Sequence, residues 1–245
     1  MRSLAANDFI LARELGVTHD AADRAVAMLS LAFPEESRDE LSRLSLGRRT
    51  ARLLDVRERL FGPELHGFAE CPQCGTALEL AMDADALRSE RPVHSAAELE
   101  LDADGFRIHF RLLDSRDLKA ASRCDGVESA RSLLVQRCVL GARRGDESID
   151  AAELPPPVID RLAQQLDECD PRAETLVALT CPACAFEWQL AFDVASFLHT
   201  EISARGRRLL SEVHALAREY GWREADILAM SDVRRREYLE LIGND

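Results

Sequence analysis

The sequence predicts an α+β protein that is mostly helical, with two matching cysteine-bearing β-units and an insertion that contains a β-hairpin. Three observations lead to this class. Apolar residues recur at helical spacing over much of the first sixty and the last fifty residues. Two Cys-Pro-x-Cys turns, 71–74 and 181–184, each lead into a stretch where apolar and polar residues alternate as in a strand. Between the turns, Asp104-Gly105 interrupts another alternating region and is a typical hairpin turn.

Residues 1–65 are predicted to form an N-terminal helical segment. The apolar spacing places one helix over residues 7–15, which Gly16 would stop, and a second helix that Thr18 would cap. Ser45 can cap a third helix, because a serine hydroxyl accepts a hydrogen bond from a free amide of the first turn. We therefore expect a small helical bundle.

Residues 66–83 and 174–193 are predicted to be the two halves of one split ribbon, because the residues after each turn match in spacing. Each turn offers two thiolates, and a structural zinc ion is bound tetrahedrally by four ligands. The simplest interpretation is that the two turns meet around one structural Zn2+, as in a zinc ribbon. The predicted ligands are Cys71, Cys74, Cys181 and Cys184.

Two other interpretations of the cysteine turns remain open. One is a redox dithiol, which places its first cysteine at the N-terminus of a helix, where the helix dipole lowers the thiol pKa. The other is a set of thiols that bind no ion. The alternation after each turn is typical of a strand and favours zinc. Gly75 suits a tight turn because glycine tolerates a positive φ, whereas Ala185 holds the same place in the second turn and departs from the ideal.

Residues 84–173 are predicted to be an α/β insertion between the ribbon halves. A short linker leads to the hairpin, and a helical region is expected from Ser115 to Leu140. The proline run 155–157 can open another helix over residues 158–166, since proline is tolerated in a first turn. A metal ion that joins the two turns would close this long loop and stabilise the docking of the insertion.

The other three cysteines have simpler interpretations. Cys138 lies in an apolar run and is predicted to be a core residue. Cys124 and Cys169 have charged neighbours and are expected at the surface or at the end of an element. Because the chain has seven cysteines, an odd number, and no apolar leader, we expect a reducing compartment and a cytoplasmic location.

Charge and composition argue against several classes of partner and activity. The net charge of −13 opposes binding to a phosphate backbone, so no nucleic-acid partner is expected. No stretch approaches the ~18 consecutive apolar residues of a membrane span, so no membrane partner is expected. The sequence shows no catalytic triad, glycine-rich phosphate loop or paired-carboxylate motif, which predicts a protein without enzymatic activity.

Residues 194–245 are predicted to form a C-terminal helical segment with an apolar stripe. Gly206 would allow a close approach within it, and Gly221 is a plausible C-cap. We expect the stripe to pack on a partner protein or on the ribbon, and the tail beyond Tyr220 to contact a partner. The arginines 234–236 are expected on a solvated face. The stripe consists of Ala195, Ile202, Leu209 and Leu216.

Several segments together carry a family resemblance. They are Phe197–Ile202, Leu209–Ala217, Tyr220-Gly-Trp222, Asp226–Leu228 and Arg234–Leu241, together with both cysteine turns and Leu112–Asp117. In these segments the chain resembles the T4-like phage baseplate protein family, whose members belong to contractile tails and phage-tail-like injection systems. The resemblance implies a baseplate component or hub assembly chaperone whose partners are other baseplate, hub or tape-measure proteins. It implies no catalytic residue.

Two hypotheses about function follow. The first is a protein-binding assembly factor for a contractile injection machine, and the second is a zinc-ribbon nucleic-acid-binding or regulatory module. The acidic charge and the resemblance favour the first.

Overall fold

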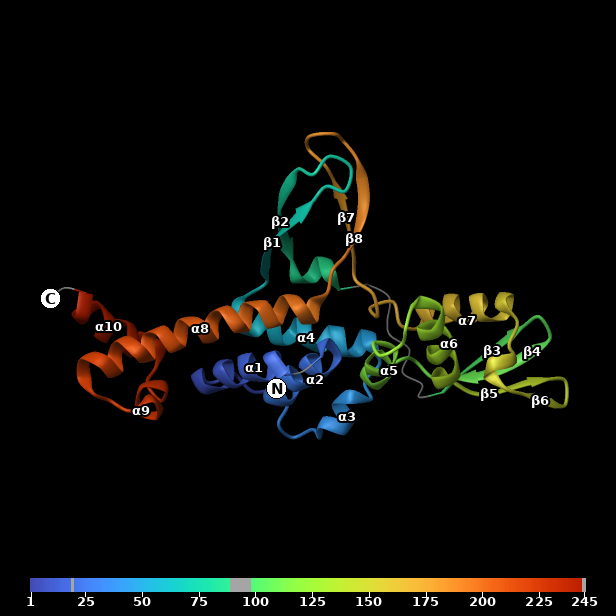
Figure 1. Cartoon of the computed structure of the whole chain (residues 1–245), viewed down its shortest axis with the longest axis horizontal. Coiled ribbons are helices and arrows are strands. Elements are labelled where there is room, and N and C mark those ends of the chain that lie inside the picture. Colours follow the sequence, from blue (N-terminus) through green and yellow to red (C-terminus); the bar gives the residue numbers. More distant parts are fainter. Residues whose placement is uncertain (19, 89–97, 244–245) are drawn as a thin grey trace.

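The protein has a helical body from which three smaller units extend (Figure 1). The computed structural model describes residues 1–18, 20–88 and 98–243, and it confirms the α+β class. The body consists of α1 (Ala6–Thr18), α2 (Ala21–Ala32), α3 (Arg38–Ser42), α4 (Leu46–Phe61) and the first half of α8 (Val194–Tyr220).

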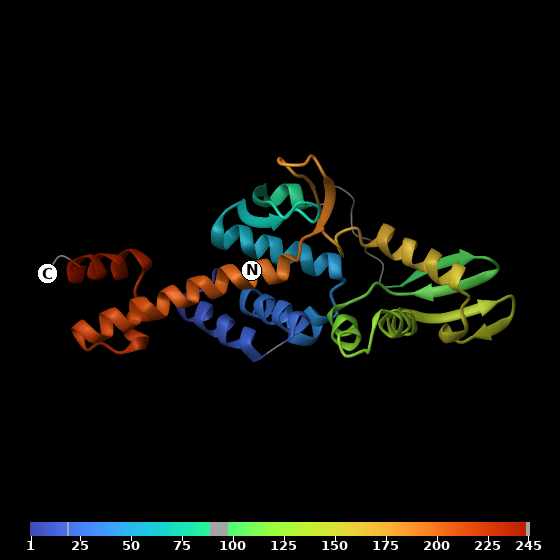
Figure 2. The same ribbon diagram turned by 45° about the horizontal axis from the view of Figure 1, so that its top comes forward.

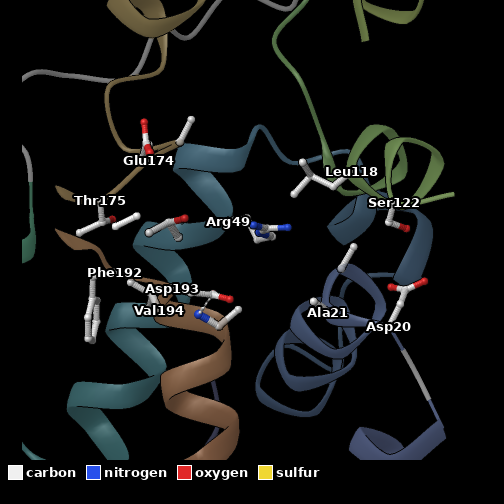
Figure 3. A pocket seen from close by; sticks show the side chains of 15 residues that line it. Asp20, Ala21, Arg49, Leu118, Ser122, Glu174, Thr175, Phe192, Asp193 and Val194 are labelled. Atoms are coloured by element: carbon white, nitrogen blue, oxygen red, sulfur yellow. Dashed lines mark hydrogen bonds between the residues drawn. The ribbon is translucent and has the colours of Figure 1, made fainter. Parts of the chain in front are cut away.

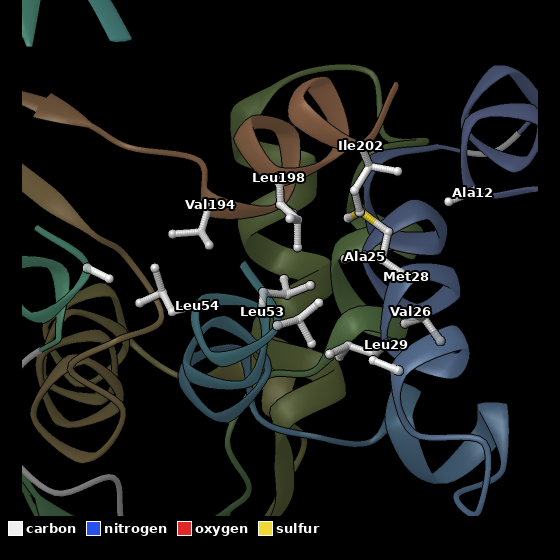
Figure 4. Packing of buried hydrophobic residues seen from close by; sticks show 14 of the residues in the cluster. Ala12, Ala25, Val26, Met28, Leu29, Leu53, Leu54, Val194, Leu198 and Ile202 are labelled. Atoms are coloured by element: carbon white, nitrogen blue, oxygen red, sulfur yellow. The ribbon is translucent and has the colours of Figure 1, made fainter. Parts of the chain in front are cut away.

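The main core lies where the apolar faces of α2, α4 and α8 meet (Figure 4). Leu29, Leu53 and Leu198 contribute one side chain from each of these helices and are fully buried. Arg57 of α4 is also buried, and its guanidinium donates to both oxygens of Glu201 on α8 at 3.0 and 2.9 Å. The segments before and after the long insertion are thus locked together in one bundle.

The N-terminal helices differ in detail from the sequence prediction. Gly16 does not stop α1, which continues to Thr18; a side chain at Gly16 would collide with the imidazole of His199, so this glycine serves a close approach to α8. The N-cap of α2 is not Thr18, which is the last residue of α1, but Asp20, whose side chain accepts the amide of Asp23. The predicted cap of α4 by Ser45 is confirmed.

A short helix that the prediction missed, α3, has a capping box. The Ser37 hydroxyl accepts the amide of Glu40, and the Glu40 carboxylate accepts the amide of Ser37. The Ser-x-x-Glu pattern was the signal that could have found this helix.

The ribbon (residues 64–83 and 176–191) consists of two antiparallel hairpins that stand beside each other and project from the body (Figures 1 and 2). The first pairs β1 (Glu64–Glu70) with β2 (Ala77–Asp83), and the second pairs β7 (Leu176–Thr180) with β8 (Glu187–Ala191). Each hairpin is a separate two-stranded sheet. A short 3-10 helix, η1 (Ala84–Leu87), follows the first hairpin at its base.

The insertion is a four-stranded antiparallel sheet with helices on one face. Its elements are β3 (Leu99–Ala103), β4 (Phe106–Phe110), α5 (Ser115–Ala121), α6 (Val127–Cys138), β5 (Val139–Arg144), β6 (Glu147–Ile149), η2 (Ala151–Glu153) and α7 (Pro156–Cys169). The predicted hairpin is confirmed: Asp104 and Gly105 both have positive φ, as its tight turn requires. The linker predicted before it includes residues 89–97, which lie outside the described residues.

One part of the insertion was predicted wrongly. The single helical region expected over 115–140 is two helices, and the chain turns into β5 at Val139. Val139 and Ala142 of β5 pair with β4 and complete the apolar face of the sheet, so non-local pairing overrides the helical pattern there. The helix opened by the proline run is confirmed and continues to Cys169.

A network of buried charge lies within the insertion, next to the point where the insertion meets the body. The fully buried carboxylate of Asp117 accepts hydrogen bonds from Arg111 at 2.7 and 2.9 Å and from Arg137 at 2.8 Å. Burial by itself raises the pKa of Asp117, but these bonds and the Asp114 amide outweigh it and hold the pKa below its usual value. Beside the network, the Leu46 amide of α4 donates to the Leu113 carbonyl at 3.0 Å.

The C-terminal module consists of the second half of α8 with α9 (Glu224–Leu228) and α10 (Asp232–Gly243). Gly221 ends α8 with φ +66, which confirms the predicted cap. The apolar stripe is covered within the chain, because its first half packs in the main core and Leu216 packs against Ile227. The prediction that the stripe faces a partner is therefore wrong, whereas its packing on the ribbon agrees with the structure at the start of α8, where Ala195 shares the main core with Leu65 of β1. Contact of the tail with a partner stays a prediction.

The arginine triplet in α10 is also not uniformly solvated. Arg235 is fully buried, while Arg234 and Arg236 are exposed. The Arg235 Nε atom donates to Glu212 of α8 at 3.0 Å, and the same guanidinium contacts Asp232. None of the described helices is long and apolar enough to cross a bilayer.

Candidate metal centre

The two cysteine turns have the same backbone geometry. In the first, the Cys71 amide donates to the Thr76 carbonyl and the Gly75 amide donates to the Cys71 carbonyl, both at 2.9 Å. The second turn repeats the pair of bonds at the same distances, from the Cys181 amide to Phe186 and from the Ala185 amide back to Cys181. The matching sequence thus folds into two copies of one knuckle.

The knuckles differ at the residue after the second cysteine. Gly75 has φ +73, and Ala185 adopts the same left-handed region with φ +57. A residue with a Cβ atom is strained there by about 1 kcal/mol. Ala185 therefore does depart from the ideal residue for this position, but the fold still holds it in the left-handed conformation.

The knuckles meet at the tips of the hairpins and bring all four predicted ligands together. The sulfur atoms of Cys71, Cys74, Cys181 and Cys184 all lie within 4.8 Å of one another. Across the knuckles, Cys71 Sγ lies 3.7 Å from Cys184 Sγ, and Cys74 Sγ lies 3.6 Å from Cys181 Sγ. A tetrahedral ion with metal–sulfur bonds of about 2.3 Å requires sulfur separations of about 3.8 Å. The cluster therefore has the size of a four-thiolate metal site.

Each knuckle contributes one buried and one exposed cysteine. Cys71 and Cys181 are 1% exposed, whereas Cys74 and Cys184 lie at the surface. Hydrogen bonds from the side chain and backbone of Thr76 lower the pKa of Cys74 to about 6. At Cys184 the Phe186 amide lowers the pKa of the thiol, but desolvation and the neighbouring sulfur atoms outweigh it and raise the pKa to about 12. One thiol of the cluster thus ionises readily, and a cation would favour ionisation of the others.

The geometry does not match the redox interpretation. Each Cys-Pro-x-Cys turn lies between two strands, so neither first cysteine sits at the N-terminus of a helix. Below the sulfur atoms the hairpins share a very small core, in which Leu78 is buried and Leu80 and Trp188 are partly buried. What this arrangement can do chemically is hold an ion that joins two otherwise weakly connected hairpins.

The remaining cysteines lie away from the cluster. Cys138 is buried in the core of the insertion, as predicted. Cys124 is half-buried just after α5. Cys169 ends α7, which agrees with an element end, but it is 5% exposed and is not a surface residue.

A second candidate site is a pocket of about 380 Å³ where the body, the insertion and the base of the ribbon meet (Figure 3). Arg49 of α4 points into it, and burial lowers the pKa of its guanidinium. Asp20, Glu174 and Asp193 contribute carboxylates to the described part of the lining. Sequence reasoning missed this pocket, because its walls come from segments that are distant in the chain.

The fold and the cysteine cluster define a mostly helical α+β protein with two matching cysteine knuckles. The chain belongs to the family described as T4 bacteriophage base plate protein, whose model matches residues 5–199. Membership gives it a role related to the phage baseplate and implies interaction with other tail or baseplate proteins. No curated protein and no solved structure matches the chain significantly.

The limits of the family match separate the chain into two parts. The match includes α1 to α4, both knuckles and the insertion, and it stops within the first half of α8. The C-terminal module lies beyond it, although most of the tail segments that carried the resemblance are found there. Membership therefore rests on the part of the fold that contains the cysteine cluster.

Proposed function

We propose that this protein is a non-enzymatic assembly factor, either a chaperone or a component, for the baseplate of a phage-tail-like contractile injection system. It acts by binding other baseplate, hub or tape-measure proteins. The observation that carries the proposal is the family match over residues 5–199.

A structural zinc ion bound by Cys71, Cys74, Cys181 and Cys184 completes the proposed scaffold. The sulfur separations of 3.6 and 3.7 Å support zinc, and four cysteines leave no open coordination position for catalysis. Untagged protein should contain about one zinc per chain by elemental analysis. Fully folded protein without metal would contradict this part of the proposal.

Deleting the gene in a strain that produces the injection particle tests the assembly role. Electron microscopy should show tails without complete baseplates, and expression of the wild-type chain from a plasmid should restore them. Mass spectrometry of purified particles then separates the two forms of the role, since a component remains in the particle and a chaperone does not. Normal baseplates in the deletion strain would overturn the proposal.

The alternative of a zinc-ribbon nucleic-acid-binding module is disfavoured by charge. The ribbon, residues 64–83 and 176–191, contains no lysine or arginine. Binding to a phosphate backbone depends on such side chains, because the free energy comes largely from charge neutralisation and counterion release.

A further inference from the structure

The outer face of the first hairpin bears an exposed aromatic side chain. Phe68 of β1 is 78% exposed and pairs across the sheet with Glu79 of β2. The pairs on either side are His66 with Ala81 and Glu70 with Ala77. These residues share one face, because side chains along a strand alternate between its two faces. The two alanines are small and leave the phenyl ring uncovered.

The hairpin does not use this face for its own packing. The opposite face points inward, where Leu65 is buried in the main core and Leu78 is buried under the cysteine cluster. An exposed phenylalanine on the outer face adds nothing to either core. An aromatic side chain in such a place is the kind of residue that anchors a protein interface when a partner pocket takes it out of water.

The charge around Phe68 selects the chemistry of the partner. The ribbon has no lysine or arginine, although 31 of the 245 residues of the chain are basic. The carboxylates of Glu70 and Glu79, on the same face as Phe68, thus have no lysine or arginine in the ribbon with which to pair. A metal ion bound by four thiolates would leave the tip of the ribbon more negative still. The carboxylates of the ribbon are Glu64, Glu70, Glu79, Asp83 and Glu187.

We infer that the outer face of β1–β2 docks a protein segment that offers an apolar pocket rimmed by lysine or arginine; this inference rests on the proposed assembly role. Phe68 fills the pocket, and Glu70 and Glu79 pair with the rim. Complementary charge of this kind raises the association rate and rejects partners of the wrong sign. Nucleic acids and anionic membranes are partners of the wrong sign for this face.

Site-specific photo-cross-linking in cells that assemble the particle tests this inference. The full-length chain carries p-benzoylphenylalanine in place of Phe68 or, as a matched control, in place of Val127, which is 80% exposed on the insertion. After irradiation, the cross-linked peptides are sequenced by mass spectrometry. Cross-links from position 68 should converge on one baseplate-protein segment in which lysine or arginine flanks the attachment site.

The carboxylates are tested by charge reversal in the same cross-linking chain. The double change Glu70→Lys and Glu79→Lys should reduce the yield of cross-linked product from position 68 at least tenfold, as expected for loss of contacts around an anchor. Raising the salt concentration from about 0.05 to about 0.5 M in cell extract should also lower this yield, because salt screens the attraction between charges. Neither treatment should change the yield from position 127. An unchanged melting temperature of each variant shows that the ribbon stays folded.

The outcomes separate this inference from the proposed function. Cross-links to a segment without basic residues, cross-links to nucleic acid, or a yield indifferent to charge reversal would overturn the docking surface. If baseplate proteins still co-purify with the chain while position 68 forms no specific cross-link, the inference fails and the assembly role stands. If no baseplate protein co-purifies at all, the assembly role fails as well.

Discussion

The ribbon and the C-terminal module both extend from the same helical body, yet they are held together in different ways. In the core shared by the described parts of the two hairpins, Leu78 is the only buried side chain besides those of Cys71 and Cys181, and it is still 9% exposed. The C-terminal module has an apolar cluster around Leu216 and Ile227, with Tyr220, Trp222 and Tyr238 packed on it. A two-stranded hairpin is at best marginally stable alone, whereas helices that bury an apolar face support each other.

The comparison shows how a chain can build two projecting units of similar size. In the proposed scaffold, cross-linking by one ion would take the place of a hydrophobic core in the ribbon. The outer face of the ribbon, including Phe68, is then not needed for internal packing. In the C-terminal module the apolar residues are already used for internal packing. The two units should therefore respond differently to the same perturbations.

Removing one cysteine of the cluster should give the largest effect. Cys71→Ser takes away a ligand, and structural zinc can contribute ~10 kcal/mol of folding free energy in small domains. We expect loss of bound zinc, a lower melting temperature and fast hydrogen exchange in both hairpins, while the C-terminal module stays protected. Cys124→Ser, which changes a thiol outside the cluster, is the matched control. A Cys71→Ser chain that keeps its zinc and its stability would show that the ribbon does not depend on the ion.

The second largest effect should come from Arg235→Ala. Arg235 is fully buried against Glu212, and removing one member of a buried ion pair leaves the other unpaired, at a cost of about 3–5 kcal/mol. Urea denaturation and hydrogen exchange should show loosening of α9 and α10, with zinc content unchanged. Arg236→Ala alters an exposed neighbour and should have little effect. Equal effects of the two substitutions would contradict a special role for the buried pair.

Gly206→Ala tests the junction between the C-terminal module and the body. A Cβ atom at Gly206 would lie 2.9 Å from the Phe9 carbonyl oxygen of α1, so the two helices must separate. Overpacking of this kind destabilises by about 1–3 kcal/mol, more than the ~1 kcal/mol that alanine gains over glycine within a helix. Thermal unfolding measures the difference. Gly141→Ala adds the same methyl group where no heavy atom lies within 4 Å and should be nearly neutral.

The smallest effects are expected from two reciprocal substitutions, one in each knuckle. Ala185→Gly should stabilise the second knuckle by about 1 kcal/mol, because glycine adopts the left-handed region without strain. Gly75→Ala should destabilise the first knuckle by a similar amount, since steric room is sufficient there and only φ is unfavourable. The temperature at which zinc is released, followed with a chromogenic chelator, should move in opposite directions. A shift of the same sign in both variants would contradict the equivalence of the knuckles.

Local chemistry allowed the sequence by itself to determine several features of this protein. The spacing within each Cys-Pro-x-Cys turn, the positive φ available at Gly105 and Gly221, and the hydroxyl of Ser45 act over a few residues. The sequence pattern consequently predicted both knuckles, the β3–β4 hairpin and the ends of two helices. The convergence of four cysteines could also be predicted, because each copy of the repeated turn offers two thiolates and a tetrahedral zinc ion needs four ligands.

Only the tertiary structure decided which surfaces are covered. The period of the apolar stripe on α8 shows that one face of the helix is buried, but it carries no information about what buries it. In the structure, this face is covered by α1, α2, α9 and α10. The same reason applies to Arg235, which was expected on a solvated face, and to Cys169, which was expected at the surface or at the end of an element. The packing of distant elements buries both. Burial is a non-local property, because it depends on residues far away in the chain, whereas turns and caps depend on the steric and hydrogen-bonding needs of adjacent residues.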